Sequence, residues 1–250
     1  MIISKMSYEE LANEVAKDYE DVREIMQRKM PDALKALRRQ SHYPAYLFST
    51  VTSPRKNKWI LIFAGKSKRR LKQYVDSFMI CTHETDHGKY VYRYDLPESA
   101  GKVPGVTFYP PHFFSRYALR MGLELTGEDL IKRYFKVNVT MHYEYEHVLF
   151  SEEELKELLN PAWYTSPDGI SLGSVTVVPG MELFICKTFV PWEMCKKDQL
   201  LKCGAAEAKR LIEDLELDAH EEDAVTRSEN NKIVQAFTAK IVALIDKQSE

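Results

Sequence analysis

The chain contains 250 residues, of which 44% are hydrophobic and 29% are charged, and its formal net charge at pH 7 is −2. A chain of this length and composition is typical of one large globular domain or two small ones. The near balance of acidic and basic residues excludes a generic polycation that coats nucleic acid, whereas a local basic cluster could still bind a phosphate backbone.

Neither membrane insertion nor disulfide bonding is expected from this sequence. No apolar run approaches the roughly 20 residues that span a bilayer, and charged residues follow the first six positions too closely for the apolar core of a signal peptide. The cysteines form no Cys-x-x-Cys pair and are scattered at Cys81, Cys186, Cys195 and Cys203. We therefore predict a cytoplasmic protein that has no membrane partner.

Residues 7–40 are predicted to form helices. Ser7 and Glu10 have the spacing of a capping box, and apolar residues then recur at helical spacing. This apolar stripe consists of Leu11, Val15, Tyr19, Val22, Ile25 and Met26. Pro31 falls near the start of a second predicted helix. The basic face of that helix, formed by Lys35, Arg38 and Arg39, is interpreted as a solvated surface.

Two pairs of strands are expected next, over 43–53 with 58–64 and over 77–83 with 89–94. The second pair is joined by Asp86-His87-Gly88, which has the chemistry of a hairpin turn. Between the pairs lies a basic stretch, residues 66–72, that lacks the glycine pattern of a phosphate-binding loop. It predicts either a solvated loop or a nucleic-acid contact, and the solvated loop is the preferred interpretation.

The second half of the chain mixes strands and helices. A strand over 106–109 stops at two prolines and is followed by a helix, and Thr126 then caps a further helix. Residues 137–165 are compatible with a strand or a helix, whereas 170–178 and 182–190 indicate two strands joined by a Pro-Gly turn. From residue 191 onward the pattern predicts one or two long amphipathic helices.

Together these elements predict an α+β fold in a single domain over residues 1–250. Helices over 7–40 and a helical segment over 191–250 are expected to flank a core over 43–190, in which antiparallel sheet packs with helices. Long amphipathic helices are therefore expected at both termini.

The predicted helix after residue 110 carries the one pattern that points to a chemistry. His112, Arg116 and Arg120 are spaced by four residues and project from nearly the same face. Three stacked groups that can be cationic fit an anionic ligand, and phosphate is the obvious candidate. The alternative is structural, with the arginines paired to the acids that follow at Glu124, Glu128 and Asp129 and with His112 as a polar residue at the helix start.

A larger pattern surrounds this helix. A strand precedes it, a second helix beginning Thr-x-x-Asp follows it, and a strand pair ending in Lys-Thr-Phe-Val completes it. The segments 109–120, 126–135 and 174–190 in this order resemble small domains related to RelE-type and barnase-type ribonuclease toxins. The resemblance implies helices against a curved antiparallel sheet and RNA cleavage without a metal. It also implies that His112 transfers a proton, that Arg116 and Arg120 hold phosphate, and that Thr188 faces them from the last strand.

Two other clusters could be read as metal sites. Residues 81–87 contain Cys81, His83 and His87, and residues 142–147 contain two histidines and two glutamates. Neither spacing matches a standard zinc pattern or the His-Glu-x-x-His template, so polar strand and hairpin residues are the preferred interpretation. No metal or cofactor is therefore expected, although a metal-dependent hydrolase that uses His83, His142 and Glu144 stays an open alternative.

The leading functional hypothesis is thus a cytoplasmic protein with a toxin-like α+β core that binds RNA or another phosphate-bearing ligand. If it is an enzyme, it is expected to be a metal-independent ribonuclease with His112, Arg116, Arg120 and Thr188 at its site. The rival hypothesis is a non-enzymatic interaction module that binds a protein partner through its C-terminal helices.

Overall fold

The computed structural model describes residues 1–3, 5–72, 75–96, 103–138, 143–145, 160–219 and 224–248. Its fold is α+β. The chain divides into two compact units, and each is described by itself. Unit 1 comprises Met1–Pro111 and Val175–Ile185, and unit 2 comprises His112–Ser174 and Cys186–Glu250. None of the described helices is both long enough and apolar enough to cross a membrane.

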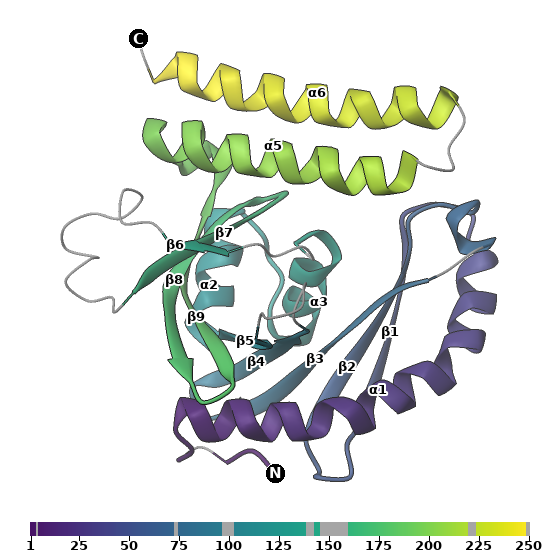
Figure 1. Ribbon diagram of the computed structural model, residues 1–250, viewed down its shortest axis with the longest axis vertical. Coiled ribbons are helices and arrows are strands. Elements are labelled where there is room, and N and C mark those ends of the chain that lie inside the picture. The colour runs from purple at the N-terminus through teal and green to yellow at the C-terminus, as the bar shows by residue number, and fades with distance from the viewer. Residues whose placement is uncertain are drawn as a thin grey trace. The chain divides into compact units, whose positions relative to one another are not determined.

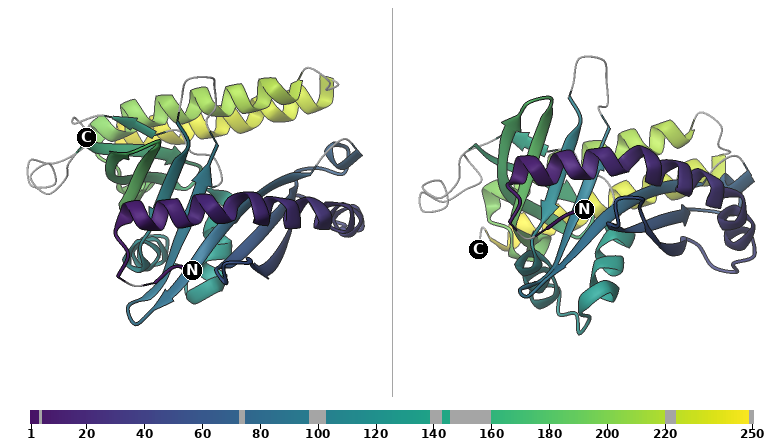
Figure 2. Two further views of the ribbon diagram at one scale, coloured as in Figure 1. Left: turned by 60° about the horizontal axis from the view of Figure 1, so that its bottom comes forward. Right: turned by 90° about the horizontal axis from the view of Figure 1, so that it is seen from below.

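Unit 1 is a sheet covered by one long helix (Figures 1 and 2). Helix α1 spans Tyr8–Arg38, and a one-turn helix, η1, spans Arg70–Lys72. Strands β1 to β5 follow one another in the sheet as antiparallel neighbours. They span Ala45–Thr52, Lys58–Gly65, Asp76–Thr85, Gly88–Asp95 and Gly105–Tyr109.

One strand pair in this sheet departs from the predicted antiparallel order. Strand β9 (Met181–Pro191) runs parallel to β5, with Gly105 opposite Glu182 and Phe108 opposite Ile185. A parallel pair needs a long crossover connection, and here the chain between the two strands supplies it. The prediction of a purely antiparallel sheet was wrong at this pair, because the sequence pattern of a strand does not encode the direction of its neighbour.

Helix α1 is one continuous element, so the prediction of two N-terminal helices was wrong. The capping box is confirmed, because Ser7 Oγ accepts from the backbone N–H of Glu10 at 3.2 Å and Glu10 Oε2 accepts from that of Ser7 at 2.7 Å. Pro31 lies inside the helix. Proline removes one helical hydrogen bond, but the buried side chains Met26 and Ala33 on either side of it hold the helix on the sheet and offset that loss.

The core of unit 1 lies between α1 and the sheet. Strand β2 contributes Trp59, Leu61 and Phe63, which are almost completely buried and alternate along the strand. Asp18 of α1 is fully buried in this core and accepts hydrogen bonds from Ser53, Asn57 and Trp59 at 2.7, 2.7 and 3.1 Å. A buried carboxylate needs such donors, and the sequence pattern gave no sign of this one.

Unit 2 contains two short helices, a sheet and two long helices. Helices α2 and α3 span Pro111–Arg120 and Gly127–Val137, with the first residue of α2 still in unit 1. Strands β6, β7 and β8 span Tyr143–Tyr145, Pro161–Ser166 and Gly169–Val178 and pair antiparallel. The sequence allowed either a strand or a helix over 137–165. In the described part of this segment the structure has two strands, β6 and β7, after the end of α3. Residues 139–142 and 146–159 of this segment lie outside the described residues.

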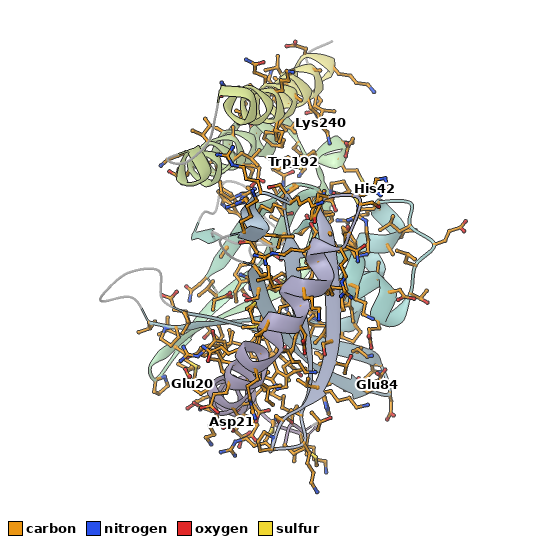
Figure 3. The ribbon with its side chains drawn as sticks, turned by 90° about the vertical axis from the view of Figure 1, so that its right-hand side faces the viewer. Glu20, Asp21, His42, Glu84, Trp192 and Lys240 are labelled. Atoms are coloured by element: carbon orange, nitrogen blue, oxygen red, sulfur yellow. The ribbon has the colours of Figure 1, made fainter. Side chains whose placement is uncertain are left out.

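The C-terminal helices pack against each other within unit 2. After a short turn, η3 (Trp192–Met194), helices α5 (Lys197–Ala219) and α6 (Ala224–Lys247) lie side by side (Figure 1). The turn η3 also packs on α6, because the ring of Trp192 lies 5.5 Å from that of Phe237 and Glu193 forms an ion pair of 2.7 Å with Lys240. Figure 3 labels Trp192 and Lys240 at this contact.

Gly169 is required where β8 begins. A Cβ atom on this residue would lie 2.2 Å from the carbonyl oxygen of Val190 and 2.8 Å from the Cα of Pro191. Both are backbone atoms that cannot rotate away, so we expect Gly169→Ala to lower the free energy of unfolding by about 2–3 kcal/mol. Urea unfolding measures this loss. Gly180→Ala is the control, because its φ of 77° strains the backbone but the space around it is open. A control loss as large as that of Gly169→Ala would contradict the steric account.

Candidate functional site

Helix α2 separates an aromatic face from a polar one. Strand β5 ends at Tyr109 and the helix begins at Pro111, whose fixed φ suits the first helical position. Phe113, Phe114 and Tyr117 are buried and contact rings of α3 and β9; Tyr117, for example, lies 4.9 Å from Phe189. His112 and Arg116 are exposed on the other side. The aromatic face therefore fixes the helix, and the cationic groups remain at the surface.

Strand β9 brings the predicted site residues together. Arg116 Nη1 donates to the carbonyl oxygen of Lys187 at 3.0 Å. Arg120 Nη1 donates to Thr188 Oγ1 at 3.1 Å and to the carbonyl oxygen of Phe189. Both arginines thus fasten α2 to β9, which is a structural role that the sequence interpretation did not include. Among the described residues Arg116 forms no ion pair with an acid, and Glu128 pairs with Lys132 at 2.8 Å.

His112 lies next to two cations. Partial burial lowers its pKa, the positive charges of Arg116 and Lys187 lower it further, and a hydrogen bond with the backbone of Lys187 acts in the opposite direction. The net effect is a pKa below the ordinary value for histidine, so the imidazole is mostly neutral at pH 7. A neutral imidazole can accept a proton, and the adjacent cations can bind an anion. We call His112, Arg116 and Lys187 the His–Arg–Lys group.

Asp168 holds the elements behind this surface in place. Its Oδ2 accepts hydrogen bonds from the Tyr117 hydroxyl at 2.6 Å, from Asn138 Nδ2 at 3.0 Å and from Arg133 Nη1 at 3.3 Å. Its own backbone N–H donates to Asn138 Oδ1 at 3.2 Å. One carboxylate therefore joins α2, the end of α3 and the β7–β8 turn. The sequence pattern gave no sign of this network.

A second cationic feature lies in unit 1, where α1 ends. Arg38 donates two hydrogen bonds, of 2.9 and 2.6 Å, to the carbonyl oxygen of Leu71 and so ties the end of α1 to η1. The stretches 35–43 and 65–72 contain no acidic residue. Their basic side chains form what we call the basic cluster, eight lysines and arginines with one histidine: Lys35, Arg38, Arg39, His42, Lys66, Lys68, Arg69, Arg70 and Lys72. Figure 3 shows His42 at the end of α1 away from Glu20 and Asp21.

The alternative metal sites gain no support from the described part of the chain. No group of three His, Cys, Asp or Glu side chains there could hold a metal ion. His142 and His147 lie outside the described residues, as does the side chain of Glu144. Cys81 and Cys186 are fully buried, and burial raises the pKa of both thiols well above the ordinary value. They are core residues, and neither is an activated nucleophile.

The arrangement in unit 2 can therefore bind an anion and accept a proton at one exposed surface. The sequence predicted His112 and Arg116 there but missed Lys187, because a lysine in a strand carries no signal of which helix it will lie beside. No protein-family model, no curated protein and no solved structure matches this chain.

Proposed function

We propose that this protein binds RNA through its phosphate backbone and cleaves it without a metal ion at the His–Arg–Lys group. The observation that carries this proposal is the position of His112, a neutral imidazole next to the two cations Arg116 and Lys187. RNA supplies both a phosphate for the cations and a 2′-hydroxyl whose proton an imidazole can accept.

In the proposed reaction His112 takes the proton of the 2′-hydroxyl while that oxygen attacks the adjacent phosphorus. The bond from phosphorus to the 5′-oxygen breaks, and this oxygen takes a proton from solvent. The products are a 2′,3′-cyclic phosphate and a 5′-hydroxyl. Arg116 and Lys187 stabilise the negative charge that grows on the phosphate. Arg120 and Thr188, joined by their hydrogen bond, hold β9 in position beside α2.

The basic cluster of unit 1 supports RNA as the ligand class. Eight lysines and arginines gather there in a chain whose net charge is −2. Lysine and arginine side chains that lie close together attract a phosphate backbone and bind it in a salt-dependent way. Free cysteines are the state expected in a reducing compartment, and all four cysteines are free. This supports the proposal that the protein acts in the cytoplasm.

The proposed function is tested with a fluorescently labelled single-stranded RNA and the DNA of the same sequence, both in EDTA. We expect the protein to bind both strands and to cut only the RNA, because DNA lacks the 2′-hydroxyl. Lys209→Ala is the control for Arg116→Ala, since Lys209 is an exposed cation of the same unit whose ion pair, within the described part of the chain, is with Glu213 at 3.7 Å. Binding of neither strand at low salt would overturn the whole proposal, and binding without cleavage would overturn its catalytic part.

A protein partner is the second candidate function. Large hydrophobic side chains are exposed on α5 and α6, namely Leu201, Ile212, Ile233 and Val242. Exposed apolar groups on neighbouring helices favour contact with another protein. Sedimentation of the purified chain with and without Ile233→Lys tests whether this face joins two copies. If the sedimentation coefficient of the wild type stays at the value of a monomer at high protein concentration, self-association is excluded.

A further inference from the structure

The charges of this chain are divided unevenly along its sequence. Residues 33–75 contain eleven lysines and arginines and no aspartate or glutamate, so this stretch carries a formal charge of +11. The other residues contain the remaining 24 of the 35 lysines and arginines and all 37 acidic residues, which gives them a net charge of −13. A charge asymmetry of this size indicates an interaction with a highly charged partner.

The fold of unit 1 gathers most of this positive charge at one place, the basic cluster. Ala45, the first residue of β1, lies opposite Gly65, the last residue of β2, so the segments before β1 and after β2 leave the hairpin at the same end. Arg38 joins the two segments through its hydrogen bonds to the carbonyl oxygen of Leu71, whose side chain is buried in the core. The cluster is therefore one surface built from two segments of the chain.

The lysines of the basic cluster are not neutralised by acids of the described chain. Four of them are exposed, namely Lys35, Lys66, Lys68 and Lys72. None of the four forms an ion pair with a carboxylate of a described residue. By contrast, the exposed Lys240 of α6 pairs with Glu193 at 2.7 Å. Like charges that are held together repel one another and lower the stability of the fold, so the uncompensated cluster indicates an anion that comes from outside the chain.

The composition of this surface fits a nucleic acid better than a protein partner. The macrodipole of α1 accounts for cations in its last turn, but not for the five lysines and arginines that follow β2. Lysine is depleted at protein–protein interfaces, whereas it is a common contact of phosphate. A nucleic-acid strand carries one negative charge for each nucleotide, so it can contact several cations of one surface at the same time.

We propose that the basic cluster is a nucleic-acid-binding surface of unit 1 that holds the phosphate backbone of RNA or DNA whatever its sequence. This inference rests on the proposed function for its class of ligand, and it assigns the affinity for that ligand to unit 1. The basic cluster then determines how tightly a strand is bound, whereas the His–Arg–Lys group of unit 2 determines how fast RNA is cut.

The test is fluorescence anisotropy of a labelled single-stranded DNA, and of the RNA of the same sequence in EDTA, with the full chain at several salt concentrations. Both strands should bind with similar affinity. The cluster variant, which combines Lys35→Ala, Lys66→Ala and Lys68→Ala, should bind at least about tenfold more weakly at low salt. The slope of log Kd against log salt concentration should fall by about 2, because each phosphate contact of a single strand contributes about 0.7.

A second triple variant is the matched control. It combines Lys5→Ala, Lys17→Ala and Lys29→Ala, and so removes three exposed lysines of unit 1 that lie outside the acid-free stretch. This control loses the same total charge as the cluster variant but should bind both strands as the wild type does. The melting temperature of the cluster variant should equal or exceed that of the wild type, because the substitutions relieve repulsion between like charges.

The inference is overturned if the cluster variant keeps the affinity and the salt slope of the wild type. It is also overturned if poly-glutamate displaces the labelled DNA at an equal or lower concentration of charge than unlabelled DNA, which would indicate an acidic protein partner. If the cluster variant binds normally and the wild type cuts RNA, this inference alone fails. If the cluster binds DNA but the wild type does not cut RNA, the catalytic proposal alone fails.

Discussion

Replacing Asp168 by alanine is expected to lower the free energy of unfolding of unit 2 by about 3–5 kcal/mol. The side chain is mostly buried, and its Oδ2 accepts from Tyr117, Asn138 and Arg133. Alanine would leave the guanidinium of Arg133 and the hydroxyl of Tyr117 without their acceptor. Leaving a charge and a polar group unpaired costs more than the hydrogen bonds themselves contributed.

Urea unfolding followed by circular dichroism measures this loss. Asp129→Ala is the matched control, because Asp129 is an exposed aspartate of the same unit in the first turn of α3. A charge at that position contributes under about 1 kcal/mol. Asp168→Asn should fall between the two, since it keeps an acceptor oxygen and removes the charge. Equal losses for Asp168→Ala and Asp129→Ala would show that the network does not stabilise unit 2.

Replacing His112 by alanine is expected to lower the rate of RNA cleavage by about 10²–10⁴-fold, the usual contribution of a general base. RNA binding should change little, because Arg116 and Lys187 stay in place. The cleavage rate of the wild type should rise with pH and level off after a midpoint below 6.5, because burial, Arg116 and Lys187 lower the pKa of His112. The base is active only when neutral, so a lower pKa extends activity to lower pH.

Arg116→Ala provides the test of this pH dependence. Removing a positive charge next to the imidazole favours the protonated form, so the midpoint of the pH–rate profile should move upward. The maximal rate should also fall, because one phosphate contact is lost. An unchanged midpoint would mean that the measured rate does not report His112. A wild-type rate that falls as pH rises through this range would contradict a neutral histidine as the base.

Much of the fold follows from local sequence signals. Ser7 and Glu10 predicted the start of α1, the Asp86–Gly88 turn predicted the β3–β4 hairpin, and apolar runs that end at turn residues predicted the strands. These signals depend on neighbours within a few residues. The parallel pairing of β5 with β9 depends on residues about 75 positions apart, and no local pattern carries that information.

In the candidate sites, too, local sequence signals predicted some features, whereas contacts between distant residues could not be predicted. The spacing of His112 and Arg116 placed both on one helical face, as the structure has them. The use of the arginines to hold β9 could not be predicted, because backbone carbonyl acceptors leave no mark in the sequence. The partners of Asp168 come from α2, from α3 and from the residue that follows α3, all at least 30 positions away.

The pKa of His112, measured by NMR titration with and without a 2′-O-methylated dinucleotide, tests the central claim most directly. This dinucleotide carries the phosphate but cannot be cut. We expect a pKa below 6.5 in the free protein and a higher pKa at saturating dinucleotide, because a bound phosphate favours the imidazolium ion. A free pKa above 6.5 would contradict a neutral imidazole next to two cations, and a pKa that saturating dinucleotide does not move would show that the His–Arg–Lys group is not a phosphate-binding site.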